Sequence, residues 1–167
     1  MDVERDMSQP VSLQPMTAIL IERVRSLDVE PGQSSFVASN DESIEDWHDN
    51  PDLLPMAIFA ADTVVGFAMM EHSEDSDGTH EINIFRLMID HRHQGRGYGR
   101  KALEALLARY RSDSRRVRIT TCFVPENAVA RRMYASLGFV ETGVDDDGEI
   151  LAELSCHSAA QKNPMPP

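Results

Sequence analysis

The segment RLMIDHRHQGRGYGRK, residues 86–101, says more about the fold of this chain than any other stretch. An apolar run ends at Asp90, a glycine-rich loop follows, and an amphipathic segment starts near Gly97 or Gly99. Apolar residues then recur three, four and seven positions apart, which predicts a helix as far as Tyr110. A glycine loop between a strand and a helix directs backbone N–H groups and the positive end of the helix dipole at one point. The segment therefore predicts an anion site, and a pyrophosphate is the natural ligand.

The spacing of the glycines narrows the choice of pyrophosphate ligand. A dinucleotide-binding loop needs a further glycine three positions after Gly97, where Arg100 stands. A P-loop needs a glycine followed by Lys and then Ser or Thr, and no glycine of this chain is followed in that way. The pattern that remains is Gln94-x-x-Gly97-x-Gly99. On its own, it fits either a cofactor loop or a turn that caps an ordinary helix.

This pattern resembles the acetyl-CoA signature Q/R-x-x-G-x-G/A of the GNAT superfamily of N-acetyltransferases. A second pattern, N-x-x-A-x-x-x-Y-x-x-x-G-F at residues 127–139, is similar to the later motif of that family. Its Asn127 and Tyr134 share one helix face with Arg131. The likeness extends over about residues 11–155 and is closest to bacterial diamine and spermine/spermidine acetyltransferase-like proteins. The narrower likeness is carried by residues 36–40, Ser43, 66–69, 85–90 and 146–149.

The resemblance implies one α/β domain with the GNAT fold, in which helices flank a mixed, mostly antiparallel central sheet. We expect this domain to span residues 11–156, between a flexible N-terminus (1–10) and a flexible tail (157–167). Sequence patterning predicts helices at 20–27, from Ser43 to Trp47, 97–110 and 127–137. It predicts strands at 56–60, 64–70, 81–90, 117–123, 139–144 and 149–155, with a polar loop at 71–79.

The family also implies an activity: direct transfer of acetyl from acetyl-CoA to the primary amine of a small cationic acceptor, a polyamine or diamine. Tyr134 would then be the general acid that protonates the departing thiolate. The backbone of the third predicted strand, the loop amides and a helix face would hold the cofactor. The cofactor-binding residues expected on this basis are Leu87, Met88, Ile89, Gln94, Gly95, Arg96, Gly97, Tyr98, Gly99, Arg100, Asn127 and Arg131.

The source of a general base is less clear from the sequence. An alkyl ammonium has a pKa of about 10.4, so the site must remove a proton before the nitrogen can attack. Relatives of the histone-acetylating type carry a carboxylate where Asn83 stands here. Glu81 shares a strand face with Asn83 and is the candidate base, acting through water, although a solvated acid at a strand start fits it equally well. Phe85, Glu30 and Asp41 are candidate contacts for the acceptor.

Charge and composition agree with an amine substrate. The formal net charge is −12, and residues 86–118 nevertheless carry ten basic side chains against three acids. This separation suits an anionic cofactor on one segment and a cationic acceptor drawn to the others, and it argues against nucleic-acid and membrane partners. The two cysteines cannot form a disulfide framework and indicate a cytoplasmic setting. Cys122 is expected to be a buried strand residue, and no metal site is expected.

Three alternatives stay open. The acceptor could be an aminoglycoside-like compound or a peptide amine instead of a polyamine. The chain could also be a non-catalytic acyl-CoA-binding regulatory module, since the direct base carboxylate is missing at Asn83. Members of the family are often dimers, so a homodimer is possible.

Overall fold

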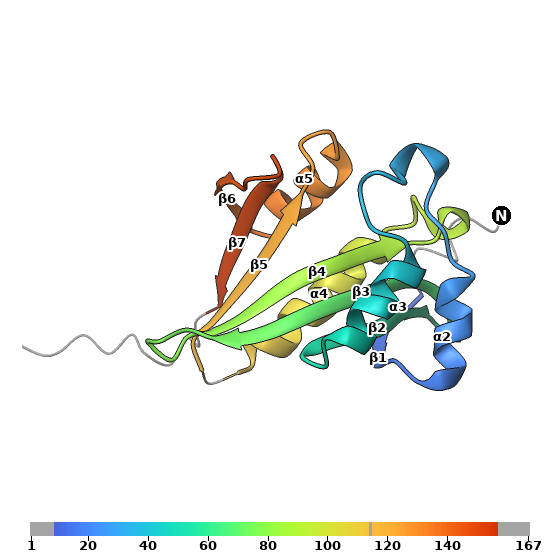
Figure 1. Cartoon of the computed structure of the whole chain (residues 1–167), viewed down its shortest axis with the longest axis horizontal. Coiled ribbons are helices and arrows are strands. Elements are labelled where there is room, and N and C mark those ends of the chain that lie inside the picture. Colours follow the sequence, from blue (N-terminus) through green and yellow to red (C-terminus); the bar gives the residue numbers. More distant parts are fainter. Residues whose placement is uncertain (1–8, 114, 157–167) are drawn as a thin grey trace, which may run out of the picture.

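A seven-stranded sheet in the order β1-β2-β3-β4-β5-β7-β6 forms the centre of the chain, with helices on both of its faces (Figure 1). The computed structural model describes residues 9–113 and 115–156. The strands are β1 (Val11–Pro15), β2 (Leu53–Ala60), β3 (Thr63–Glu74), β4 (His80–Ile89), β5 (Val117–Phe123), β6 (Val140–Val144) and β7 (Ile150–Cys156). The helices are α2 (Ala18–Arg25), α3 (Asn40–Asp49), α4 (Tyr98–Arg111) and α5 (Ala128–Ser136), with short 3-10 turns at Pro31–Gln33 and His91–His93.

Only β4 and β5 run parallel; every other neighbouring pair in the described sheet is antiparallel. This confirms the expected mixed, mostly antiparallel sheet. The apolar stripe of α4 packs on one face, with Leu103 and Leu107 almost fully buried. The apolar residues of α2 pack on the other face, where Val24 contacts a second cluster around Phe67. We call these the α4 face and the α3 face of the sheet; in Figure 1, α4 lies behind the strands and α2 and α3 lie in front.

The helix expected from Ser43 begins three residues earlier, because a capping box sets its start. The Ser39 side chain accepts a hydrogen bond from the backbone N–H of Glu42, and the Glu42 carboxylate accepts one from the backbone N–H of Ser39. The buried amide of Asn40 donates to the carbonyls of Val24 (2.8 Å) and Leu27 (3.1 Å). These bonds attach the first turn of α3 to the end of α2, so the segment between the two helices has fixed ends.

Two parts of the sheet differ from the sequence prediction. β1 was not predicted, because Val11–Pro15 is short and contains two polar residues and a proline. The predicted loop 71–79 is wrong in its first half, since β3 continues to Glu74 and pairs with β4 from His80 onward. Strands can pair through their backbones in an exposed hairpin without an apolar pattern, so the polar sequence does not indicate that β3 continues here.

β4 and β5 separate after a few residues, and this separation creates the site. Their parallel pairing runs from His80 opposite Val117 to Ile84 opposite Thr121, and beyond that point the two strands diverge in Figure 1. We call the point just beyond the Ile84–Thr121 pair the vertex. At the same level β4 has a bulge, because Arg86 and Ile84 lie opposite the consecutive residues 69 and 70 of β3. Phe85 is therefore an extra residue in β4 at the vertex.

The described chain begins two residues before β1 and stops at the end of β7. Gln9 and Pro10, expected to be flexible, already contact the fold: Lys101 Nζ donates to Gln9 O, and the Ala61 N–H donates to Pro10 O. The rest of the two expected flexible termini, residues 1–8 and 157–167, lies outside the described residues. Within the described residues, no helix is both long enough and apolar enough to cross a bilayer.

Candidate active site

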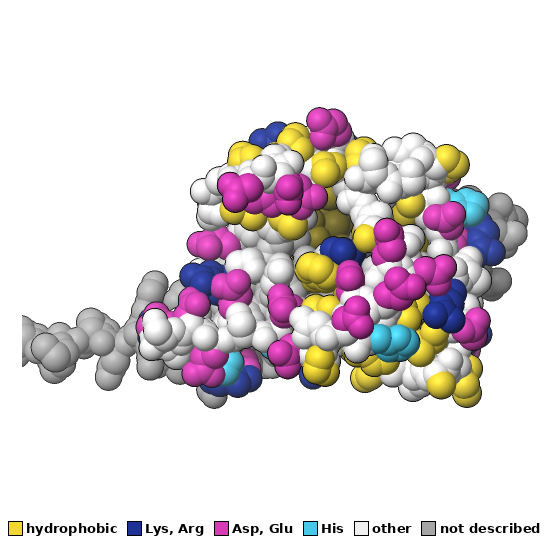
Figure 2. Space-filling model, viewed as in Figure 1, with side chains coloured by type: hydrophobic (Ala, Val, Ile, Leu, Met, Phe, Trp, Pro, Cys, Tyr) yellow, Lys and Arg dark blue, Asp and Glu magenta, His cyan; other side chains and the backbone are white. Residues whose placement is uncertain are grey.

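The gap between β4 and β5 opens into a cavity of about 960 Å³. Its wall is formed by the diverging strands, the start of α4, the inner side of α5 and the segment between α2 and α3. Figure 2 shows the hollow with hydrophobic side chains at its floor, a basic side chain at its rim and acidic side chains nearby. The sequence-predicted residues that line it are Phe85, Leu87, Met88, Ile89, Gln94, Gly95, Gly97, Tyr98, Gly99, Arg100, Asn127 and Tyr134.

One end of the cavity is built to receive an anion. Gly97 is the N-cap of α4 with φ 77°, a left-handed conformation that favours glycine. A glycine N-cap supplies no side-chain acceptor, and the N-terminus of this 14-residue helix lines the cavity at residues 97–100. A Cβ at Gly97 would meet nothing within 4 Å, which leaves open space beside the backbone. These features fit a pyrophosphate.

The arginines near this end have different surroundings. Arg100 lines the cavity, donates to Glu104 at 2.9 Å and also contacts Ser136. Arg131 is not part of the described lining, because its guanidinium binds both carboxylate oxygens of Glu141 at 2.6 and 2.8 Å. Arg132, which sequence reasoning missed, lines the cavity one position further along α5. Arg131 was favoured because it shares a face with Asn127 and Tyr134, but its partner on β6 could not be foreseen.

Arg96 is likewise not part of the described lining; its guanidinium donates to the carbonyl of Arg92 at 3.3 Å. Gln94 lies inside the cavity wall and donates through Nε2 to the carbonyl of Ile89 at 2.9 Å. The same amide pairs with the amide of Gln33 at 2.7 Å. The glycine loop is therefore bonded both to the end of β4 and to the segment between α2 and α3.

Asp90 makes a second connection between these parts. Its carboxylate is 1% exposed and accepts hydrogen bonds from the backbone N–H of Asp28 and from the side chain and backbone of Arg92. Burial alone would raise the pKa of Asp90, but these donors outweigh it and lower the pKa to about 2. The buried carboxylate of Asp90 therefore connects the start of the glycine loop to the segment that follows α2.

Tyr134 enters the cavity from the α4 face. It is 5% exposed, stacks on Phe123 with ring centroids 5.6 Å apart, and meets Phe139 edge-on at 5.1 Å. Burial raises its pKa to about 12, although a hydrogen bond with Thr121 acts in the opposite direction. The phenol therefore keeps its proton at neutral pH. Asn127 begins the same helix as its N-cap and accepts the Ala130 N–H at 3.1 Å while also lining the cavity.

The edge of β4 beyond the vertex is exposed to the cavity. On the side of β5, the described chain offers no strand partner for residues 85–89. Leu87, Met88 and Ile89 line the cavity along this edge, while β3 pairs with the opposite edge. Unpaired backbone groups of a strand can bind an extended ligand in the way that another strand would.

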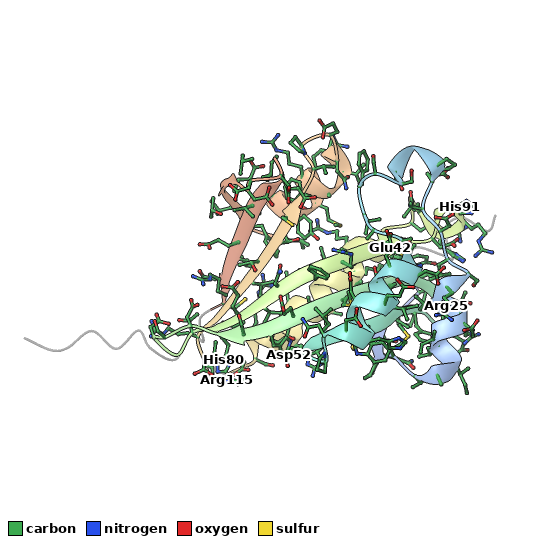
Figure 3. All side chains as sticks on the ribbon, viewed as in Figure 1. Arg25, Glu42, Asp52, His80, His91 and Arg115 are labelled. Carbon is green, nitrogen blue, oxygen red and sulfur yellow. The ribbon has the colours of Figure 1, made fainter. Side chains whose placement is uncertain are left out.

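The α3 face of the vertex carries a cation that the sequence analysis did not single out. The Arg86 guanidinium lies 4.0 Å from the ring centroid of Phe85, donates to Asp46 at 3.4 Å, and lines the cavity. Its Nε is buried and has no hydrogen-bond partner among the described residues. Glu42 lies beside it on the cavity wall and is labelled in Figure 3 at the start of α3. Its pKa is lowered by hydrogen bonds from Ser39.

The three carboxylates predicted to act on the acceptor lie elsewhere. Glu81 is not part of the described lining: it binds Arg118 at 2.5 and 3.1 Å, and it sits three residues before the vertex, roughly 10 Å along the strand. Glu30 also lies outside the lining. Asp41 pairs with Arg25 at 3.0 Å and borders a smaller neighbouring cavity of about 410 Å³. Arg25 is labelled on α2 in Figure 3.

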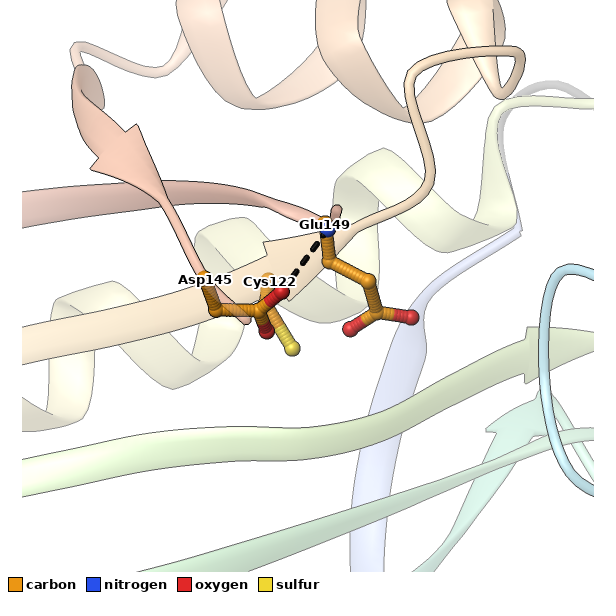
Figure 4. A group of neighbouring side chains, drawn as sticks. All are labelled: Cys122, Asp145 and Glu149. Carbon is orange, nitrogen blue, oxygen red and sulfur yellow. Dashed lines mark hydrogen bonds between the residues drawn. The ribbon is translucent and has the colours of Figure 1, made fainter. Parts of the chain in front are cut away.

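Cys122 corrects one expectation, because it is exposed and lines the cavity instead of being buried. Partial desolvation, together with a hydrogen bond to Glu149, raises the pKa of the Cys122 thiol to about 12, which disfavours a thiolate nucleophile. The ligand atoms of Cys122, Asp145 and Glu149 lie within 4.8 Å of one another (Figure 4). Glu149 also lines the cavity, although the sequence analysis gives it no role in the site.

Known proteins are similar to this chain in sequence and in fold. The family described as "Acetyltransferase (GNAT) family" matches residues 21–139. The spermine/spermidine N(1)-acetyltransferase of Bacillus subtilis (strain 168) is 30% identical over 131 residues, covering 75% of this chain and 86% of that protein.

Two solved structures have a similar architecture. The spermidine N-acetyltransferase from Vibrio cholerae, in complex with CoA and spermine, has a TM-score of 0.65 at 18% identity, covering 87% of this chain and 95% of that one. An aminoglycoside acetyltransferase in complex with coenzyme A has a TM-score of 0.65 at 20% identity, covering 87% and 94%. At these identities the structures support the fold alone. The family match covers well over half of the chain, and this chain therefore belongs to the GNAT family of acetyltransferases.

Proposed function

We propose that the protein transfers an acetyl group from acetyl-CoA to a primary amine of a small cationic acceptor, with a polyamine or diamine as the favoured class. The observation that carries this proposal is the cavity wall that joins a helix N-terminus with a glycine N-cap, a strand edge without a strand partner among the described residues, and a buried tyrosine. An anion, an extended amide-bearing arm and a leaving group would each find a matching partner along this wall. Two similar structures are complexes with CoA, which supports acetyl-CoA as the cosubstrate.

Three groups of residues along the cavity wall would bind acetyl-CoA. The amides at Gly97–Arg100 would bind the pyrophosphate, with Arg132 close by. The edge of β4 at 87–89 would hold the pantetheine arm and polarise the thioester carbonyl, which supplies the electrophile. Asn127 lies where it can contact the same arm.

Tyr134 would donate a hydrogen bond to the departing sulfur. A complete proton transfer from a phenol of pKa about 12 to a thiolate of pKa about 8.5 is uphill by roughly 5 kcal/mol. Tyr134 therefore transfers its proton to the sulfur only while the reacting nitrogen transfers a proton to the phenol. The phenol is restored in the same step. Direct attack by the amine needs no acyl-enzyme, and the protonated thiol of Cys122 agrees with that.

The charge of the chain favours a cationic acceptor. Outside residues 86–118 the chain is strongly acidic, and the total charge is −12. Glu42 brings one of these acids into the cavity wall. A field of this sign raises the local concentration of a polyamine at low salt. The 30% identity to a spermine/spermidine acetyltransferase supports the same class.

One observation favours a second candidate class. Arg86 places a guanidinium on the cavity wall, held against Phe85 and Asp46. A fixed cation there disfavours a second ammonium nearby and suits a carbonyl or hydroxyl oxygen close to the reacting amine. An aminoglycoside-like or peptide amine carries oxygens of this kind, whereas a polyamine has none.

An amine panel monitored by release of free thiol tests the proposal. Spermine, spermidine and a diamine are compared with an aminoglycoside and a short peptide, each with acetyl-CoA. Faster turnover of the polyamines supports the proposed acceptor, and faster turnover of the oxygen-rich amines supports the second class. Acetyl-CoA binding by calorimetry without turnover of any amine would reject the enzymatic proposal in favour of a binding module.

A further inference from the structure

The sheet has two faces at the vertex, and the proposed general acid lies on one of them. Tyr134 lies on the α4 face with Phe123 and Ile150. Side chains alternate along a strand, so Cys122 projects to the α3 face, as do Arg118 and Thr120, which contact Glu81 there. An amine that attacks across the gap from Tyr134 comes from the α3 face. Its base must therefore lie on that face and line the cavity.

Glu149 meets both conditions. It directly precedes β7, in which Ile150 and Ala152 pack into the α4-face core, so alternation directs residues 149, 151 and 153 to the α3 face. β7 pairs Ile150 with Phe123 and Leu151 with Cys122, which places Glu149 beyond the vertex, on the side where the cavity opens. Glu149 is half-buried and lines the cavity next to Cys122. Glu81 lies on the same face but on the paired side of the vertex, outside the described lining, and is bonded to Arg118.

The hairpin between β6 and β7 fixes the position of Glu149. Its backbone N–H donates to Asp145 Oδ1 at 2.8 Å, drawn as the dashed line in Figure 4, and its carbonyl accepts the Asp145 N–H at 3.0 Å. Gly148 completes the turn with φ 85°. The charged and titratable groups that face this point are Cys122 on β5, Asp145 on the hairpin and Arg86 on β4. Asp145 raises the pKa of the Cys122 thiol, and Arg86 lowers it. The thiol stays protonated and can donate to the Glu149 carboxylate, which orients it.

We propose that Glu149 is the general base of the reaction and takes the proton from the acceptor ammonium in the cavity. This inference rests on the proposed function. Glu149 accepts one N–H proton and passes it to solvent, and the neutral nitrogen forms the C–N bond as the C–S bond breaks. Tyr134 protonates the departing sulfur, and the second proton lost from nitrogen restores the phenol. One proton is released for each amide and thiol formed, so atoms and charge balance.

The test replaces Glu149 by Gln, which keeps the shape of the side chain and removes the carboxylate. The matched control is Glu153→Gln, which lies in β7 and on the same face but outside the described cavity lining. Glu81→Gln tests the competing base directly. With an acceptor that the wild type turns over, we expect E149Q to lower kcat/KM about 100-fold or more at pH 7, with the affinity for CoA unchanged by calorimetry. The defect should shrink as the pH approaches about 10, where roughly 30% of the amine is already neutral.

A second readout needs no cosubstrate. The Glu149 carboxylate is one of the groups that raise the pKa of Cys122, so E149Q should speed alkylation of Cys122 by iodoacetamide in the ligand-free protein, and E153Q should not. Glu149→Asp keeps a carboxylate and should retain part of the activity with the wild-type pH dependence. Peptide mapping separates Cys122 from the buried Cys156.

The outcomes are distinct. A defect in E149Q of less than threefold, or an equal defect at pH 7 and pH 10, overturns the role of Glu149. A loss of the same size in E81Q instead moves the base to Glu81. An unchanged alkylation rate in E149Q shows that Glu149 does not face Cys122 and also overturns the inference. If the wild type binds CoA but turns over no amine, the proposed function itself fails, and the inference fails with it.

Discussion

The role of Tyr134 can be tested by a substitution that changes one atom. In Tyr134→Phe the ring keeps its stack on Phe123 and its edge contact with Phe139, because neither contact involves the hydroxyl. The lost hydrogen bond with Thr121 costs about 1 kcal/mol of folding free energy. Loss of the donor to the leaving sulfur should cost more, about 10²- to 10⁴-fold in kcat. The change should therefore reduce the rate far more than the stability.

The assay is thiol release at saturating acetyl-CoA and acceptor, with urea denaturation of the same preparations. Tyr110→Phe is the matched control: Tyr110 is 8% exposed and its hydroxyl bonds His72 at 2.8 Å, away from the cavity. It should lose similar stability and keep its kcat. Because the pKa of Tyr134 is about 12, the wild-type kcat should not fall from ionisation of this group below about pH 10. A kcat for Y134F within threefold of wild type would refute the acid role.

Three further changes test the cofactor end and its anchoring. Gly97→Ala should cost about 1 kcal/mol of stability and weaken CoA binding in calorimetry, because φ 77° is strained for alanine while the space around it is open. Arg132→Ala should weaken CoA binding, whereas Arg131→Ala should leave it within twofold, since Arg131 is held by Glu141; equal losses would contradict this division. Asp90→Asn should remove about 2 kcal/mol at pH 7. The pKa of Asp90 is lowered in the fold, so its contribution to the free energy of unfolding is complete above about pH 4 and disappears as the pH falls through about 2. The urea midpoints of the wild type and D90N should therefore converge near pH 2.

The cofactor half of the site could be predicted because its signals are local in sequence. A glycine at positive φ, a helix start with a glycine N-cap and an apolar stripe all lie within residues 86–110, and each has a sequence pattern. The same holds for Asn127, which stands at the first position of the predicted helix and is its N-cap. Because the conformation of this segment is set by residues that are close in sequence, distant contacts change it little.

The acceptor half could not be predicted in this way, because its members come together through the sheet. Glu81 was favoured by its face, but its partner Arg118 lies 37 residues away on the neighbouring strand. Glu149 reaches the cavity only because β7 inserts between β5 and β6, an order that the sequence does not reveal. The bulge at Phe85 likewise depends on the pairing with β3. The signal that could have pointed to Glu149 is its position just before a strand whose alternate residues are apolar.

The opposite faces of Tyr134 and Glu149 keep the acid and the base from bonding to each other. A carboxylate next to the phenol would accept its hydrogen bond and so compete with the departing sulfur for that donor. Here Thr121 and Cys122 are adjacent in β5, yet one is buried beside Tyr134 and the other is exposed beside Glu149. The strand itself separates the acid from the base, and only a ligand that crosses the gap between β4 and β5 can contact both. Proton transfer at the two groups is then coupled through the reacting nitrogen and sulfur, and not through the protein.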